Sequence, residues 1–347
     1  MAEDTEQNSG REAAFEILEP YLEVDIQPLI GMKTVQILLL REALDYLVLR
    51  TEDTREINEV TTPSRAAKGG EIRRVAFLGS KQKAVESREF ERLLREAWKA
   101  PESGGLPAQR KAQGGKDCYL KDNLCLRCPR CALFGATSTE SGKGQEPNIK
   151  HRIEYSTAFS LLPYEEVTEE ITFNAINDDK QITGQALGTR PCVRPGTLFA
   201  SIVTLRSATQ RELVLVLKTL LSAHSYGAES RTGGDLRNHV VGVIGGWEEV
   251  LTPLEFTLEC EQRLESVVKE DARPGAMNEI VETYWKNCAD PSKIVLVNTV
   301  GQSGEKKLPV RKGLVELLDA VRGTPIDKAF LESAYSDVAG LRKAQGV

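Results

Sequence analysis

The stretch Thr197-Leu-Phe-Ala-Ser-Ile-Val-Thr-Leu205 is followed by Thr209-Gln-Arg-Glu212 and the apolar run from Leu213 to Ala223, and this order is the strongest indication of the fold class. The first segment is rich in β-branched residues and predicts a strand. Thr209 and Glu212 have the spacing of a capping box, in which both side chains bind amides left unpaired at a helix start. The helix that follows is apolar nearly all round, so we expect it to be buried on a sheet.

Strands and helices alternate on both sides of this unit. The apolar run 34–40 predicts a buried strand, although residues 41–49 also fit helical spacing. Further strands are predicted at 152–162, 240–244, 254–259 and 294–299, and helices at 80–99, 313–321 and 326–343. This order favours an α+β fold in which a sheet packs on helices.

Residues 165–194 predict a long β-hairpin with little core of its own. Alternation is sparse, with Ile171 and Phe173 the main apolar positions before a turn at 177–180. A two-stranded hairpin is marginal in water unless it packs on something else. We therefore expect this hairpin to rest on a partner.

The loop 225–239, Ser-Tyr-Gly-Ala-Glu-Ser-Arg-Thr-Gly-Gly-Asp-Leu-Arg-Asn-His, is the first candidate binding site. Its glycines allow close approach of the backbone to a phosphate, and Arg231 and Arg237 could neutralise one. It lacks the Lys-Ser/Thr of a nucleotide P-loop, and it joins a helix to a strand, unlike a dinucleotide fingerprint. A helix C-cap with a long connection is an equally good interpretation of the loop alone.

Charge is distributed unevenly along the chain. The 347 residues hold 45 Lys and Arg against 51 Asp and Glu, a net charge of −6 that argues against a nucleic-acid binder. Residues 61–152, however, carry 19 basic against 10 acidic residues. Such a segment can attract a polyanion, although chance and solvated helix faces explain it equally well. With 40% hydrophobic residues, no membrane-length apolar run and no signal sequence, we expect a cytoplasmic protein with no membrane partner.

Four of the seven cysteines fall within fourteen residues: Cys118, Cys125, Cys128 and Cys131. Four thiolates satisfy a tetrahedral Zn²⁺ with no open position, which is typical of a structural site. Arg127 and Arg130 would offset the remaining negative charge. The flanking segments are turn-rich and poor in apolar residues, so residues 101–150 are predicted to be a metal-dependent insertion. An iron–sulfur cluster and free thiols are the alternatives, but the Cys-Pro of the bacterial ferredoxin run is missing.

The sequence offers little support for a catalytic motif. The three histidines, His151, His224 and His239, lie in no Ser or Cys nucleophile motif, and neither HExxH nor a carboxylate pair stands out. An Asp-dependent nuclease is still an alternative, because carboxylates are abundant in the sequence. Binding without chemistry is the favoured hypothesis.

The segments GTRPCVRPGTLFASIVTL, TQRELVLVLKTLLSAH and SYGAESRTGGDLRNHVVGVIGG resemble the backbone subunit of type I-D CRISPR effector (Cascade-like) complexes. That is the Csc-two family, within the Cas-seven (RAMP) superfamily. The insertion CYLKDNLCLRCPRCALFGATS is similar to the family's zinc-binding subdomain. The resemblance extends from about Gly31 to the C-terminal helices.

The resemblance implies an RRM-like (ferredoxin-like) β-α-β-β-α-β core over residues 20–347. This core would carry the zinc insertion 101–150, a thumb hairpin at 165–194, and C-terminal helices at 310–347. Copies of the chain would form a helical filament along a guide RNA (crRNA), presenting its bases to target DNA while the protein holds the sugar-phosphate path. The large, cap and RNA-processing subunits of a type I-D complex would be further partners in antiviral defence.

The resemblance also implies the RNA-binding residues, which lie in the basic insertions, the hairpin and the glycine-rich loop: Arg65, Lys68, Arg73, Arg74, Lys81, Arg190, Arg194, Tyr226, Arg231, Thr232, Arg237 and Asn238. Type III relatives cut RNA with an early loop aspartate, but neither Asp45 nor Asp53 aligns with it convincingly. We therefore predict that the chain is not an enzyme. The alternatives are a RAMP-type RNA-processing or target-cleaving endoribonuclease, or a zinc-ribbon adaptor in which residues 101–150 bind alone.

Overall fold

The computed structural model describes residues 15–50, 56–66, 70–99, 118, 124–137, 146–177, 182–228, 234–301 and 307–347, and over 173–187 the backbone only. The strands are β1 Thr34–Ala43, β2 Glu59–Pro63, β3 Glu71–Phe77, β4 Ile153–Tyr155, β5 Ala158–Ser160, β6 Thr168–Asn177, β7 Ile182–Val193, β8 Leu198–Arg206, β9 Leu236–Gly246, β10 Val295–Asn298 and β11 Val310–Lys312. The helices are α2 Gly79–Lys99, α4 Pro129–Phe134, α5 Tyr164–Val167, α6 Gln210–Ser222, α7 Pro253–Gln262, α8 Leu264–Val268, α9 Arg273–Trp285, α10 Leu314–Gly323 and α11 Lys328–Ala344, with 3-10 turns η1 Glu19–Tyr21 and η3 Pro291–Lys293.

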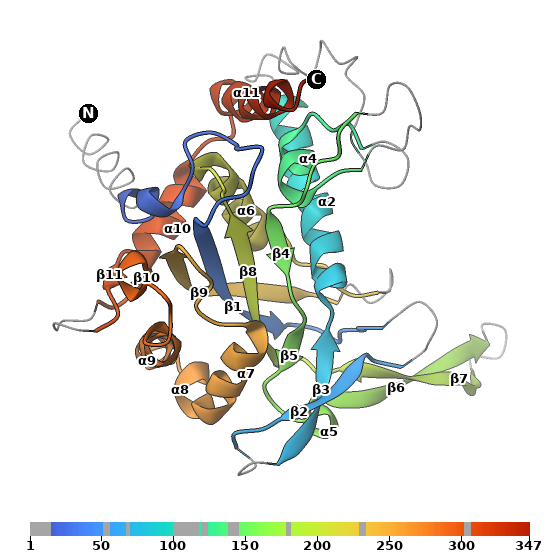
Figure 1. The fold of residues 1–347 in the computed structure, drawn as a ribbon. Coiled ribbons are helices and arrows are strands. Elements are labelled where there is room, and N and C mark those ends of the chain that lie inside the picture. The colour runs from blue at the N-terminus through green and yellow to red at the C-terminus, as the bar shows by residue number, and fades with distance from the viewer. Residues whose placement is uncertain are drawn as a thin grey trace, which may run out of the picture.

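One large, mostly antiparallel sheet organises the molecule (Figure 1). Among the described residues its strand order is β11-β10-β9-β1-β8-β5-β3-β2, with β4 also paired to β8. The central strand β1 lies between β8 and β9, so Ile37 stands opposite both Val203 and Val243. The α+β class expected from the sequence is confirmed.

Both faces of the sheet are covered, which explains the unbroken apolar run in β1. Ile37 and Leu39 belong to a core shared with α2, α6, α10 and α11, while Leu38 and Leu40 belong to a core shared with α7 and α9. Successive strand residues point to opposite faces, so a strand covered on both sides needs apolar residues at every position.

Several elements follow the sequence predictions closely. The capping box forms, with Thr209 Oγ1 accepting from the Glu212 amide at 3.3 Å and Glu212 Oε2 accepting from the Thr209 amide at 3.0 Å. The predicted helices 80–99, 313–321 and 326–343 correspond to α2, α10 and α11.

The predicted strand 254–259 is wrong, because these residues form helix α7. Thr252 and Glu255 make a second capping box, and Pro253 occupies the first helical turn, where a missing amide costs nothing. The helical alternative for 41–49 is also wrong, since β1 continues to Ala43 and the chain then runs on without a helix.

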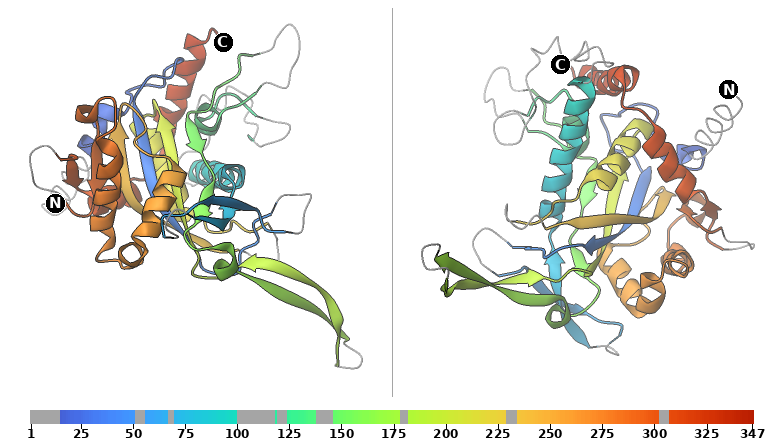
Figure 2. Two further views of the ribbon diagram at one scale, coloured as in Figure 1. Left: turned by 60° about the horizontal axis from the view of Figure 1, so that its bottom comes forward. Right: turned by 180° about the vertical axis from the view of Figure 1, so that it is seen from behind.

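The hairpin expected at 165–194 is present as β6 and β7, which form a two-stranded sheet; at its base Val193 also makes an antiparallel bridge with Leu47. It projects well away from the sheet and its helices (Figure 2). The predicted turn at 177–180 lies almost wholly outside the described residues.

Candidate nucleic-acid interface and metal centre

A fully buried ion pair lies at the neck of the glycine-rich loop, beside Tyr226 and Asn238. Arg41 of β1 and Glu86 of α2 both have 0% exposed side chains, and Arg41 Nη1 lies 2.6 Å from Glu86 Oε1. Burial alone would lower the pKa of Arg41, but the charge and hydrogen bond of Glu86, together with the nearby Tyr226 and Tyr155, offset this and raise that pKa. No sequence pattern indicates this pair, because the two residues are 45 positions apart and neither belongs to a motif.

Residues from both ends of the loop bind this pair. The Tyr226 hydroxyl donates to Glu86 Oε1 at 2.9 Å, and Asn238 Oδ1 accepts from Arg41 Nη1 at 2.8 Å. Asn238 Nδ2 in turn donates to the Tyr226 hydroxyl oxygen at 2.9 Å. Burial, and next the charge of Glu86, raise the pKa of Tyr226 far above its ordinary value. Tyr226 is therefore held as a neutral phenol in the interior.

The neck of the loop is tight. Leu236 N donates to His224 O at 2.8 Å, and Tyr226 N donates to Gly234 O at 3.2 Å, which closes a short antiparallel ladder. Gly234 has φ +59°, and a Cβ there would lie 2.6 Å from Gly227 Cα. The close approach of the two backbone segments at this point therefore requires glycine. Arg231 and Thr232 lie outside the described residues.

Arg237 follows the neck on β9 and is exposed. Its guanidinium forms no hydrogen bond or ion pair within the part of the chain that the structure describes. Two residues further on, His239 Nε2 lies 2.8 Å from Glu42 Oε2. Of the arginines predicted to bind RNA, Arg237 thus has its full hydrogen-bonding capacity available to a ligand.

Other predicted RNA-binding arginines have carboxylate partners within the chain. Arg73 pairs with Glu165 at 2.7 Å and stacks on Tyr164, and Arg194 pairs with Glu169 at 3.0 Å. Their exposed fractions are 43% and 47%, so these pairs are open to solvent.

Three further predicted RNA contacts lie in the described part of the chain, and a fourth lies outside it. Arg65 pairs with Glu259 and donates to the Tyr284 hydroxyl at 3.1 Å. Lys81 is half-buried in the first turn of α2, and Arg190 is half-buried on β7. Lys68 lies outside the described residues.

Arg74, Tyr226 and Asn238 need correction as direct RNA contacts. Arg74 has a 0% exposed side chain that pairs with Glu261 at 2.9 Å and donates to Ser160 O at 2.7 Å. Its role is to join β3 to α7 and β5. Tyr226 and Asn238 are likewise buried and hold the neck of the loop from inside. The sequence does not separate a buried arginine from an exposed one when both lie in a polar strand.

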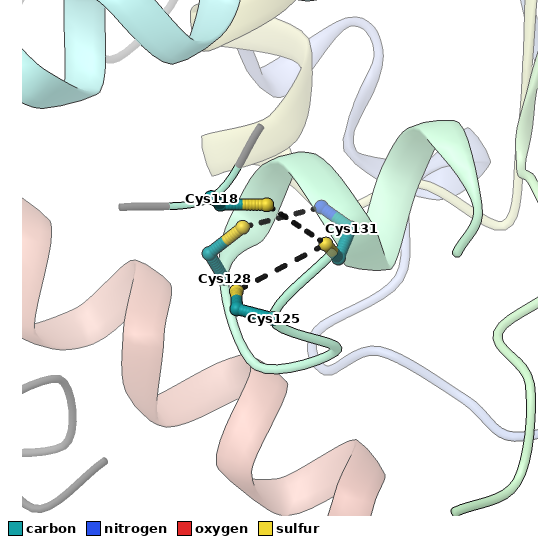
Figure 3. Close-up of side chains that lie close together, drawn as sticks. All are labelled: Cys118, Cys125, Cys128 and Cys131. Carbon is teal, nitrogen blue, oxygen red and sulfur yellow. Dashed lines mark hydrogen bonds between the residues drawn. The ribbon is translucent and has the colours of Figure 1, made fainter. Parts of the chain in front are cut away.

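The four clustered cysteines come together as predicted (Figure 3). Their sulfur atoms all lie within 4.8 Å of one another, with Cys118 Sγ 3.3 Å and Cys125 Sγ 4.0 Å from Cys131 Sγ. A tetrahedral Zn²⁺ with 2.3 Å bonds requires sulfur atoms about 3.8 Å apart. Hydrogen bonds from Cys118, Cys128 and Cys131 lower the pKa of Cys125, whereas those with Cys118 and Cys125 raise the pKa of Cys131. This cluster could hold a metal ion.

The cysteine cluster is joined to the main core. Cys118, Cys128 and Cys131 are fully buried in the core shared with α2 and α11, and Phe134 of α4 packs edge-on against Phe90 of α2 at 5.3 Å. Arg130 is buried against α2, where its Nε donates to Ser87 Oγ at 2.9 Å, while its Nη1 has no hydrogen-bond partner among the described residues. Arg127 instead pairs with Glu146.

The family model described as "Csc2 Crispr" matches residues 21–335, and the chain belongs to this family. No curated protein matches the chain.

Solved structures show the same fold. The crystal structure of Thermofilum pendens Csc2 is similar at 23% identity, with a TM-score of 0.64 and 94% of each chain covered. A chain of a CRISPR RNA-guided surveillance complex, pre-nicking, is similar at 12% identity, with a TM-score of 0.50, covering 83% of this chain and 99% of that one. Within the described residues, no helix is long and apolar enough to cross a bilayer.

Proposed function

We propose that this chain is the non-catalytic, crRNA-binding backbone subunit of a type I-D CRISPR interference complex. Its membership of the Csc2 family supports a role in such a complex. The observation that carries the RNA-binding role is Arg237, an arginine without a partner among the described residues. It lies beside a glycine-rich loop whose neck is fixed by the buried Arg41–Glu86 pair. A donor held in place beside a fixed neck binds a phosphate at little entropic cost.

The proposed RNA contacts lie on the loop, the hairpin base and the strand β3 region. Arg237, with Arg231 and Thr232 of the loop, forms the central contact. Arg73 and Arg194 would exchange a carboxylate partner for a phosphate, and Arg65, Lys68, Lys81 and Arg190 complete the proposed set. Because exposed ion pairs contribute little stability, such an exchange is inexpensive.

The centre of the sheet supports an RRM-like unit. The order β1, α2, β4, β8, α6 and β9 along the chain follows β-α-β-β-α-β, and β9, β1, β8 and β4 are neighbours in the sheet. We propose that the hairpin β6–β7 acts as the thumb and binds the next copy in a helical filament. Its two strands have no other strand partner among the described residues, which suits that role.

The four cysteines are the proposed ligands of a structural Zn²⁺. The all-thiolate donor set fits zinc, and the unpartnered Nη1 of buried Arg130 suits a site whose metal complex carries negative charge. Zinc would cross-link Cys118 and Cys125 to Cys128 and Cys131 at the start of α4. Since this region is packed on α2 and α11, the zinc-ribbon adaptor, in which residues 101–150 act alone, is disfavoured.

The test is the salt dependence of RNA binding. The double variant Arg231→Ala and Arg237→Ala should lower the slope of log K against log salt by about 1.4, since each contact to a single strand contributes about 0.7. The matched control removes two exposed charges elsewhere, Arg311→Ala and Lys343→Ala, and should leave the slope unchanged. Equal slopes in both double variants would refute the placement.

The absence of catalysis and the further partners are part of the same proposal. Incubation with RNA and Mg²⁺ should leave the RNA intact, whereas cleavage lost in Asp45→Ala, Asp53→Ala or His239→Ala would favour the endoribonuclease. Purification from the native host should recover short RNAs of uniform length with a shared repeat-derived end, together with target-DNA-binding activity and the large, cap and RNA-processing subunits.

A further inference from the structure

The edge of β9 has a gap. At one end, residues 234–236 pair with 224–226, and at the other end residues 243–245 pair with β10. Between them no described strand pairs with residues 237–242 on the side away from β1. Leu236 N points to this outer side, where it reaches His224 O. Because the direction alternates along a strand, the amides of Asn238 and Val240 point to the same side.

A cleft of about 420 Å³ lies at this gap. The strand β9 forms its floor, and α6, α9 and α10 provide its walls; the view from behind in Figure 2 shows α6 and α10 beside β9. Its volume is in the range of small-molecule sites. One wall is apolar and includes Leu221, Leu314 and Leu318.

The polar lining of the cleft is basic. Three arginines, Arg237, Arg273 and Arg322, stand against one glutamate, Glu270. Arg273 donates to the carbonyl groups of Val267 and Val268, and Arg322 pairs with Asp319, so these two are engaged.

Two basic side chains of the lining have no partner within the described part of the chain. Arg237 and the exposed His224 form no hydrogen bond or ion pair there, and the buried Thr299 hydroxyl at the cleft wall has none either. The unused donors therefore gather along the open edge of β9.

We propose that this cleft binds a single nucleotide unit. Its phosphate lies at the open edge, between the amides of Asn238 and Val240 and the guanidinium of Arg237, with His224 beside it. Its base lies against the wall formed by Leu221, Leu314 and Leu318. Backbone amides and an arginine are the usual partners of phosphate oxygens, and an apolar wall with few polar groups suits a base.

This inference rests on the proposed function, because it adds a nucleotide site beside the RNA-binding loop. The nucleotide can come from a free mononucleotide or from an RNA strand that passes Arg237. Free 5′-AMP and a twelve-nucleotide RNA carrying one photoreactive adenine distinguish the two sources. Adenosine, which lacks the phosphate, is the matched control ligand.

The cleft can be filled without a change in charge. Leu318→Trp places a large side chain in it, and Val315→Trp, at a 51% exposed position on the same helix, is the matched control. Leu318→Trp should weaken 5′-AMP binding about tenfold or more, equivalent to about 1.4 kcal/mol, and Val315→Trp should leave it unchanged. The photoreactive RNA should crosslink to peptides from α10 or from 221–224, and this crosslink should be lost in Leu318→Trp.

Failure of this inference is distinguishable from failure of the RNA-binding proposal. If wild-type protein binds the RNA but does not bind 5′-AMP and shows no crosslinks at the cleft, the nucleotide site alone is overturned. Equal 5′-AMP affinities in Leu318→Trp and Val315→Trp would overturn it as well. Binding of 5′-AMP with no retention of RNA would support the cleft as a site for free nucleotides and refute the RNA-binding role.

Discussion

Replacing Glu86 by Gln tests whether the buried ion pair positions the glycine-rich loop. The substitution preserves shape but removes the charge that compensates Arg41, whose side chain is fully buried. Loss of one partner of a buried pair costs about 3 kcal/mol or more. With an unfolding entropy of about 2.1 cal/mol/K per residue, 347 residues give a fall in Tm of about 4 °C.

RNA affinity should fall along with stability. Glu86 accepts from the Tyr226 hydroxyl, and Arg41 donates to Asn238, so the change loosens both ends of the loop. A loss of about tenfold in RNA affinity is expected, equivalent to about 1.4 kcal/mol. Thermal unfolding and fluorescence anisotropy with a labelled RNA, below the lower Tm, measure the two effects separately.

The matched control is Glu212→Gln. Glu212 forms an ion pair with Arg152 that is almost as buried, with 4% and 3% exposed side chains, but it lies at the opposite end of α6 from the loop. It should cost similar stability and leave RNA affinity unchanged. If both variants weaken RNA binding equally, the loss reflects general destabilisation and the positioning role of Glu86 is refuted.

Three other predictions follow from the metal centre, the hairpin and an ion pair. Metal analysis should find one zinc per chain, and Cys131→Ser or chelation should lower Tm and release α11 to proteolysis; an unchanged Tm without metal would contradict a structural site. Replacing residues 171–190 by a short glycine linker should leave Tm within about 2 °C and abolish RNA-dependent assembly, because the hairpin adds little to the core; a large fall in Tm would contradict this. Burial alone would raise the pKa of Glu146, but Arg127 and Arg342 lower that pKa below its ordinary value. The ionised carboxylate therefore stabilises the folded protein above pH 4.5, and this contribution is lost as pH falls through the folded-state pKa. Glu146→Gln should therefore reduce the stability difference between pH 7 and pH 3 in urea unfolding, and an unaltered difference would show that the pair contributes nothing.

The elements predicted correctly are those whose signals are local. The capping box at Thr209 and the apolar helix after it depend only on neighbouring residues, as does the spacing of the four cysteines. The error at 254–259 has the same local origin, since Thr252 and Glu255 carry a capping signal that a short apolar run obscured. A local sequence pattern does not indicate which face of the sheet the helices will cover.

The candidate site was predictable only in part. Arg237 follows from its place beside the glycines, but the burial of Arg74 depends on Glu261, almost two hundred positions away. The Arg41–Glu86 pair and the gap along β9 arise from long-range packing and strand register. These features depend on contacts between residues that are far apart in the sequence, so the neighbouring sequence does not indicate them.

The contact between the cysteine region and α11 has a consequence for biosynthesis. Arg342 donates to Pro147 O and pairs with Glu146, contacts that join positions 195 and 196 residues apart. A growing polypeptide exposes its thiols to the cell long before its final helix leaves the ribosome. A metal ion bound by this cluster could therefore enter until the last helix docks, and a prematurely terminated product would leave the four thiols uncovered and accessible to oxidants or quality-control proteases.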